Sequence, residues 1–160
     1  MKVFAAYPTP FWREAGLNGF VTSIDPDSVL SGVFDNSPPD GKPGVLYGLI
    51  EGDAAREWGP RPAAERKAAV LDAFARFFGP GAREPTDYLE QDWASMPWIR
   101  GGPTVVFAPG TWTKYGAALR APVDRIHWAG TETAIEQWGS MDGAISAAMR
   151  AVHEVLGKTV

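Results

Sequence analysis

Proline and glycine interrupt this chain so often that only short strands and helices fit between them. The 160 residues include 18 Gly and 14 Pro, a larger share than the roughly 12% of an average protein. The first 50 residues alternate such turns with stretches of β-branched and aromatic residues. The pattern predicts a short strand at 2–7 and three consecutive strands, an antiparallel meander, at 20–24, 29–35 and 44–50.

The hydrophobic period then changes to that of a helix. Apolar residues recur at helical spacing through 62–78, where one face carries Val70, Leu71, Phe74, Phe77 and Phe78. Pro62 suits the first turn of this helix, and Gly79-Pro80 ends it. Weaker patterns predict a strand at 88–93, an extended run at 104–107 and a helix at 112–120. Strands and helices in this order indicate the α+β class.

The region after residue 120 has the sharpest pattern. A short strand is predicted at 125–129, followed by Gly130, a loop at 131–140 and a helix at 142–156. One face of this helix is apolar and consists of Ile145, Ala148, Met149, Val152, Val155 and Leu156. Small residues in its first turns, including Gly143, allow another segment to pack closely against it.

Composition excludes several classes of protein. The chain has no Cys, which excludes a disulfide scaffold, a thiolate metal site and a cysteine nucleophile. Its formal charge of −4 argues against a nucleic-acid partner, and two His without Cys argue against a transition-metal site. No apolar run reaches the roughly 18–20 residues that span a bilayer, and no signal-peptide core is present. We therefore expect a cytoplasmic protein without a transmembrane segment.

The strand–glycine–loop–helix pattern at 125–157 is the best candidate for a chemical site. A helix N-terminus favours an anionic ligand, while Gly139 and Gly143 would let a ligand approach the backbone. Glu132 could accept hydrogen bonds from sugar hydroxyls. The same pattern also fits an ordinary connection with a glycine-rich cap. His127 and His153 are interpreted as structural, and the carboxylates form no acid–base pair.

The tryptophans leave two interpretations open. Five of the seven lie in the second half of the chain, namely Trp93, Trp98, Trp112, Trp128 and Trp138. They either fill a core or line an aromatic pocket. A tryptophan-rich sugar-binding module is a further hypothesis, which rests on composition alone.

Several motifs resemble the C-terminal portion of the flavin-containing monoamine oxidase family. The sequence AGTETA at 129–134 and GSMDGA at 139–144 match that family's C-terminal flavin signature. YPTPFWR at 7–13, EQDW at 90–93 and FAPG at 107–110 match other landmarks in the same order. The family's Gly-x-Gly-x-x-Gly turn and its upstream lysine have no counterpart here.

The resemblance implies a partial amine-oxidase fold. Residues 1–120 would form part of the substrate-binding domain, an antiparallel or mixed sheet with the helix at 62–78. Residues 121–160 would form the final strand and helix of the Rossmann-like FAD-binding domain. The last helix would then lack part of its packing surface, so we expect Ile145, Met149 and Val152 to be partly exposed.

The resemblance also implies a cofactor site for FAD. Gly130, Thr131 and Glu132 would lie beside the ribityl and phosphate groups, and the backbone N–H groups of Gly139, Ser140 and Met141 would face the pyrimidine edge. Trp93 matches a tryptophan near the flavin. Gly102 occupies the position of the flavin-linking cysteine, which implies noncovalent FAD. The implied activity is oxidation of a small amine by hydride transfer to flavin, with O2 giving H2O2.

Two departures affect the implied substrate pocket. The positions of the family's paired tyrosines hold Pro103 and Ser140, which carry no aromatic ring. Trp98 and Trp138 are the candidate replacements, so the predicted pocket comprises Trp98, Pro103, Trp138 and Ser140. The alternative is a noncatalytic remnant or partner-binding module derived from the same fold. A separate N-terminal FAD-binding chain and self-association are the two expected kinds of protein partner.

Overall fold

The computed structural model describes residues 1–102 and 106–157, which form two compact units. Unit 1 comprises Met1–Arg100 and unit 2 begins at Gly101. The boundary predicted at 120/121 refers to the domains of a complete oxidase and stays a prediction.

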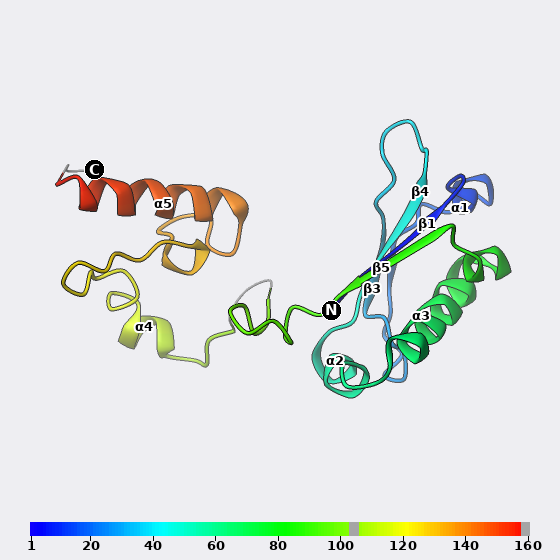
Figure 1. Cartoon of the computed structure of the whole chain (residues 1–160), viewed down its shortest axis with the longest axis horizontal. Coiled ribbons are helices and arrows are strands. Elements are labelled where there is room, and N and C mark those ends of the chain that lie inside the picture. The colour runs from blue at the N-terminus through cyan, green and yellow to red at the C-terminus, as the bar shows by residue number, and fades with distance from the viewer. Residues whose placement is uncertain (103–105, 158–160) are drawn as a thin grey trace. The chain divides into compact units, whose positions relative to one another are not determined.

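Unit 1 is built on a five-stranded antiparallel sheet with the order β2-β3-β4-β1-β5 (Figure 1). The first strand pairs with β4 on one side and β5 on the other, so that Phe4 lies opposite both Tyr47 and Leu89. The predicted meander is confirmed as β2, β3 and β4, although β2 and β3 are shorter than expected. The strand bounds are β1 Lys2–Tyr7, β2 Val21–Thr22, β3 Gly32–Asp35, β4 Gly44–Leu49 and β5 Asp87–Gln91.

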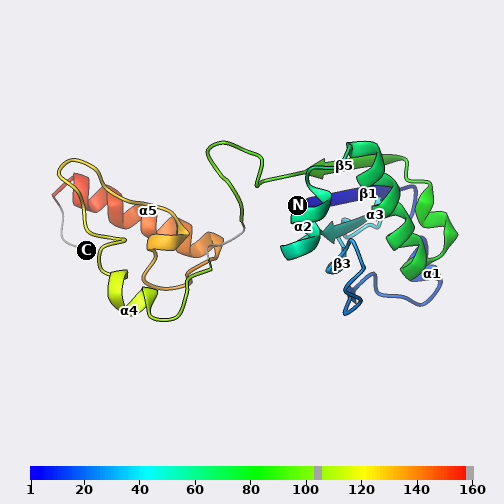
Figure 2. The same ribbon diagram turned by 90° about the horizontal axis from the view of Figure 1, so that it is seen from below.

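The predicted helix at 62–78 forms as α3, Ala63–Phe78, and covers one face of the sheet (Figure 2). Alternate residues of β1 and β4 point into this core, where they pack with the apolar face of the helix. The largest fully buried side chains of the core include Trp12, Tyr7, Phe74, Leu46 and Val3. Short helices complete unit 1, namely α1 Phe11–Glu14, α2 Gly52–Trp58 and η1 Pro80–Arg83.

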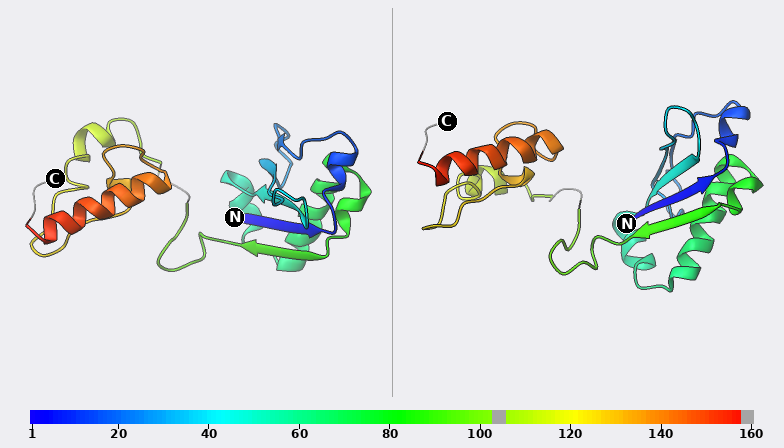
Figure 3. Two further views of the ribbon diagram at one scale, coloured as in Figure 1. Left: turned by 90° about the horizontal axis from the view of Figure 1, so that it is seen from above. Right: turned by 45° about the horizontal axis from the view of Figure 1, so that its top comes forward.

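The described part of unit 2 contains little regular structure besides one long helix, α5, Met141–Val155 (Figure 3). The predicted helix at 142–156 is thereby confirmed. Two further helical segments lie among its described residues, α4, Thr111–Tyr115, and η2, Thr131–Thr133. The predicted helix at 112–120 is shorter than expected because Gly116, a poor helix residue, follows α4 and the chain continues in turns.

The strand predicted at 125–129 is wrong. The only backbone pairing in this stretch of the described chain is an isolated bridge between Val123 and Ile126. A strand needs a neighbouring backbone along its whole length, and the described part of unit 2 offers none. The extended run predicted at 104–107 lies partly outside the described residues, and Val106 and Phe107 have no regular structure.

The apolar face of α5 is largely exposed, as predicted. Ile145, Met149 and Val152 each keep more than half of their surface accessible, whereas Ala147 is buried. Within the described residues, no helix is both long enough and apolar enough to cross a membrane.

Candidate functional site

The N-terminus of α5 is capped by Ser140. Its Oγ accepts a hydrogen bond from the backbone N–H of Gly143 at 3.0 Å, and its hydroxyl donates to the Gln137 carbonyl at 2.6 Å. A cap of this kind satisfies one of the four N–H groups that a helix leaves free at its start. The partial positive charge of the 15-residue helix is therefore presented at Ser140 and Met141.

Gly143 lets the first turn of α5 contact the preceding loop directly. A Cβ at this position would lie 2.2 Å from the Gln137 carbonyl oxygen and 3.1 Å from Thr131 Oγ1. The prediction of close packing at Gly143 is confirmed, but the neighbour is this chain's own backbone rather than a ligand. Gln137 and Gly139 both have positive φ, at 52° and 81°, which bends the loop back onto the helix.

The predicted Gly130–Glu132 segment forms a tight turn beside this helix. Gly130 has a φ of 106°, a conformation that favours glycine, and its carbonyl accepts from both the N–H and the hydroxyl of Thr133. The Thr131 hydroxyl is buried and has no partner among the described residues. An unpaired buried hydroxyl is costly, so this atom is a candidate contact for a ligand that is not part of the chain.

An ion-pair network lies at the other end of α5. Glu154 pairs with Arg150 on its own helix and with His127, whose Nδ1 lies 2.9 Å from Glu154 Oε2. Hydrogen bonds from His127 and Arg150 hold the pKa of the Glu154 carboxyl below its ordinary value. The structural role expected for His127 agrees with this pairing. Arg150 is a residue that no sequence motif predicts, since its only signal is the four-residue spacing from Glu154.

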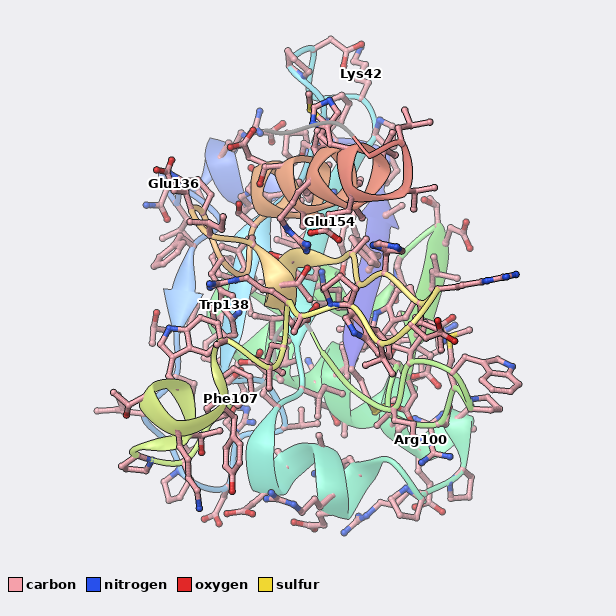
Figure 4. The ribbon with its side chains drawn as sticks, turned by 90° about the vertical axis from the view of Figure 1, so that its left-hand side faces the viewer. Lys42, Arg100, Phe107, Glu136, Trp138 and Glu154 are labelled. Carbon is pink, nitrogen blue, oxygen red and sulfur yellow. The ribbon has the colours of Figure 1, made fainter. Side chains whose placement is uncertain are left out.

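Three aromatic side chains cluster in unit 2. Phe107 and Trp112 stack with ring centroids 5.5 Å apart, and Trp138 lies 5.9 Å from the first and 6.1 Å from the second. The Trp138 Nε1–H donates to the Glu132 carbonyl at 3.3 Å, which attaches the cluster to the Gly130–Thr133 turn. Phe107 and Trp138 are labelled in Figure 4. Both tryptophans remain partly exposed, so the cluster is neither a sealed core nor a closed pocket.

The remaining predicted site residues lie elsewhere in the chain. Trp93 and Trp98 belong to unit 1 and follow β5, where Trp98 is almost fully exposed. Pro103 lies outside the described residues, and Gly102, the last described residue before it, has a φ of 151°. Among the described residues, no three His, Asp or Glu side chains come together in a way that could hold a metal ion.

Family comparison accounts for nearly the whole chain. The family model described as flavin containing amine oxidoreductase matches residues 1–156. The chain therefore belongs to the family of flavin-containing amine oxidoreductases. The predicted resemblance is confirmed, and FAD is the cofactor that membership of this family implies.

Individual relatives show which part of the family's chain is present. AofH of Mycobacterium tuberculosis, which carries the name of a flavin-containing monoamine oxidase, is 44% identical over 96% of this chain and 33% of its own. An L-amino acid dehydrogenase of Synechocystis is 40% identical over 98% of this chain and 33% of its own. The structure of putrescine oxidase with bound putrescine matches with a TM-score of 0.87 at 36% identity, over 98% of this chain and 34% of that one. The chain thus spans about a third of the length of these relatives.

Proposed function

We propose that this chain forms the C-terminal portion of an FAD-dependent amine oxidase, in which the Gly130–Thr133 turn and the N-terminus of α5 contact the flavin. The observation that carries the proposal is the buried, unpaired Thr131 hydroxyl at the start of α5, in a family whose members contain flavin. The relatives are about three times as long, so the activity is proposed for this chain together with the portion that it does not cover.

The residues of unit 2 fit the sugar-phosphate part of FAD. Thr131 offers a buried hydroxyl without a partner among the described residues, and Gly130 has no side chain that would stand between its backbone and a ligand. Glu132 carries a carboxylate that can accept hydrogen bonds from ribityl hydroxyls. Gly130, Thr131 and Glu132 would thus each contact the sugar-phosphate part of FAD.

The residues at the start of α5 fit the polar edge of the flavin ring. Gly139 and Met141 lie where the start of the helix exposes N–H groups, whereas the Ser140 N–H already donates to the Gln137 carbonyl at 3.1 Å and its side chain serves as the cap. The helix dipole stabilises negative charge placed there. Bound flavin supplies the redox chemistry by accepting a hydride from the amine carbon. Gly102 offers no thiol, so the proposal specifies noncovalent FAD.

We assign Trp138, Ser140 and, from the sequence alone, Trp93, Trp98 and Pro103 to the surroundings of flavin and amine. Trp138 is the best supported of these pocket residues because its ring is held by a hydrogen bond and two aromatic contacts. Ser140, which caps α5, stands where the family has a tyrosine ring. The amine would therefore contact an aromatic side chain only at Trp138.

A graft tests the proposal. Residues 1–156 would replace the corresponding third of putrescine oxidase, with wild-type putrescine oxidase as the positive control. We expect the purified graft to retain flavin, detected by its visible absorption, and to produce peroxide when amines are added. A folded graft that takes up no flavin would overturn the proposal. Flavin uptake without any amine-dependent reaction would favour the noncatalytic alternative.

A further inference from the structure

We propose that Arg150 is a positioning residue, which holds the Gly130–Thr133 turn against α5 through hydrogen bonds on both sides of Gly130. The inference deepens the proposed function and rests on it, because this turn carries the three residues that we assign to the sugar-phosphate part of FAD.

Arg150 forms hydrogen bonds with residues outside its own helix. One guanidinium nitrogen, Nη2, donates to the Trp128 carbonyl at 2.7 Å and to Thr133 Oγ1 at 3.1 Å. The other, Nη1, pairs with the Glu154 carboxylate. The side chain is 14% exposed, and its bonds to Thr133 and Glu154 are partly buried, whereas the bond to the Trp128 carbonyl is exposed. A single side chain therefore holds the chain two residues before Gly130 and three residues after it.

The hydrogen bonds continue from Arg150 into the turn itself. Thr133 Oγ1 accepts from Arg150 and in turn donates to the Gly130 carbonyl at 2.9 Å. The Thr133 backbone N–H donates to the same carbonyl at 3.0 Å. Linked hydrogen bonds of this kind polarise and strengthen one another. The position of Gly130 thus depends on the position of the guanidinium group.

A second arginine holds the far end of the turn. Arg120 Nε donates to the Thr133 carbonyl and its Nη2 donates to the Ala134 carbonyl, both at 3.3 Å. The Arg120 guanidinium also lies 5.6 Å from the Trp112 ring centroid. These bonds are longer than those of Arg150, and they hold the exit of the turn rather than Gly130. Arg150 is therefore the stronger determinant of the cofactor-facing part.

Glu154 and His127 orient the Arg150 side chain. Glu154 uses one oxygen for Arg150 and the other for His127, and its carboxylate points from α5 toward the neighbouring loop (Figure 4). The planar guanidinium can serve the carboxylate, the carbonyl and the hydroxyl together because its donors are fixed in a fork. A lysine ammonium keeps the charge but cannot reproduce this set of directions.

The bonds that Arg150 makes outside α5 distinguish its proposed positioning role from simple stabilisation of the helix. An Arg–Glu pair four residues apart stabilises a helix only slightly, and either partner can be lost at the same small cost. The bonds from Arg150 to Trp128 and Thr133 do not stabilise the helix in this way, since both acceptors lie outside α5. Loss of Arg150 should therefore loosen the turn much more than loss of Glu154.

Hydrogen exchange on the 160-residue chain tests the positioning role without cofactor. In Arg150→Lys we expect the amides of Thr133 and Ala134 to exchange at least about tenfold faster, because the charged hydrogen bonds that order the turn are lost. Exchange in α3 should be unchanged. Glu154→Gln should have a smaller effect. Arg125→Lys, in an exposed residue of the same segment, is the matched control and should have none. Unchanged exchange in Arg150→Lys would overturn the inference.

The flavin-bearing graft tests the consequence for the cofactor. There we expect Arg150→Lys to weaken FAD binding at least about fivefold relative to the unmodified graft, while Arg125→Lys leaves the affinity unchanged. Equal FAD affinity in Arg150→Lys and the unmodified graft would overturn the link to the cofactor. If the unmodified graft takes up no FAD, the proposed function fails, whereas the exchange experiment still decides the role of Arg150 in the turn.

Discussion

The indole Nε1–H of the fully buried Trp12 donates to Asp35 Oδ2 at 2.8 Å and ties the short helix α1 to the end of β3. Arg13 donates to the same oxygen at 2.7 Å, and the Ser37 N–H donates to Oδ1 at 2.9 Å. Gly19 lies so close that a Cβ there would be 2.6 Å from Asp35 Cβ. The Asp35 carboxylate therefore joins α1, the end of β3 and the loop at Ser37.

Asp35→Asn should destabilise unit 1 by about 1–3 kcal/mol at pH 7, because a buried indole donor and an arginine lose their anionic acceptor. Urea unfolding measures the change. Asp27→Asn, in an exposed loop residue, should leave the unfolding free energy within about 0.5 kcal/mol of the original value. Equal effects of the two substitutions would contradict a role for the Asp35 contacts.

Acid should remove the contribution of Asp35. Burial of this carboxyl raises its pKa, but hydrogen bonds from Arg13, Ser37 and Trp12 outweigh burial and hold the pKa far below its ordinary value. A lowered folded-state pKa gives stability that is present above the unfolded value, about 3.9, and is lost as the pH falls toward the folded value. The stability difference between wild type and Asp35→Asn should therefore shrink below about pH 4. A difference that grows with acidification would be the contrary result.

Tyr7 should make the fold sensitive to alkali. Its hydroxyl donates to the Ala82 carbonyl at 2.9 Å, and burial raises the pKa of this phenol well above the ordinary value. The resulting stability is present below the unfolded pKa, about 10, and is lost as the pH rises beyond it. Tyr7→Phe should cost about 1–3 kcal/mol at pH 7 by leaving that carbonyl unpaired, and the cost should decrease above about pH 10. Tyr115→Phe, at a half-exposed position, should change neither quantity.

Gly143→Ala should disrupt the start of α5. The added Cβ would lie 2.2 Å from the Gln137 carbonyl oxygen, so the helix must shift, at a cost of about 1–3 kcal/mol in unit 2. Thermal unfolding measures the loss, and Ala148→Ser at an exposed position of the same helix is the control. An unchanged melting temperature in Gly143→Ala would show that this contact does not constrain the loop.

Helix prediction from the sequence was accurate where a local pattern decided the outcome. The helical spacing of apolar residues between Pro62 and Gly79 predicts both ends of α3 to within one residue. The apolar face that follows Ser140 predicts α5. The strand at 125–129 was wrong because a strand depends on a partner elsewhere. Trp12–Asp35 and Arg150–Trp128 join residues 23 and 22 positions apart, so no local pattern could predict them. Sequence motifs indicate the glycines of the candidate site, whereas no motif indicates Arg150, which bonds to residues on both sides of Gly130.

Substitution of Thr131 distinguishes a structural role of its hydroxyl from a contact with a ligand. Because this buried group has no partner among the described residues, Thr131→Val should leave the stability of the chain unchanged or slightly raised. Thr133→Val should lower it, since that hydroxyl bonds to both Arg150 and Gly130. In the graft, Thr131→Val should instead weaken FAD binding. Lower stability of Thr131→Val without FAD would identify a structural partner for the hydroxyl and remove it from the cofactor site.

The most direct test of the central claim is the amount of flavin bound per molecule of the graft that joins residues 1–156 to the remainder of putrescine oxidase. Visible absorption after gel filtration in excess FAD gives this ratio. The account predicts stoichiometric, noncovalent flavin that denaturation releases. A graft that is folded by circular dichroism and melts cooperatively, yet elutes without flavin, would contradict the claim that this chain supplies a flavin-binding surface.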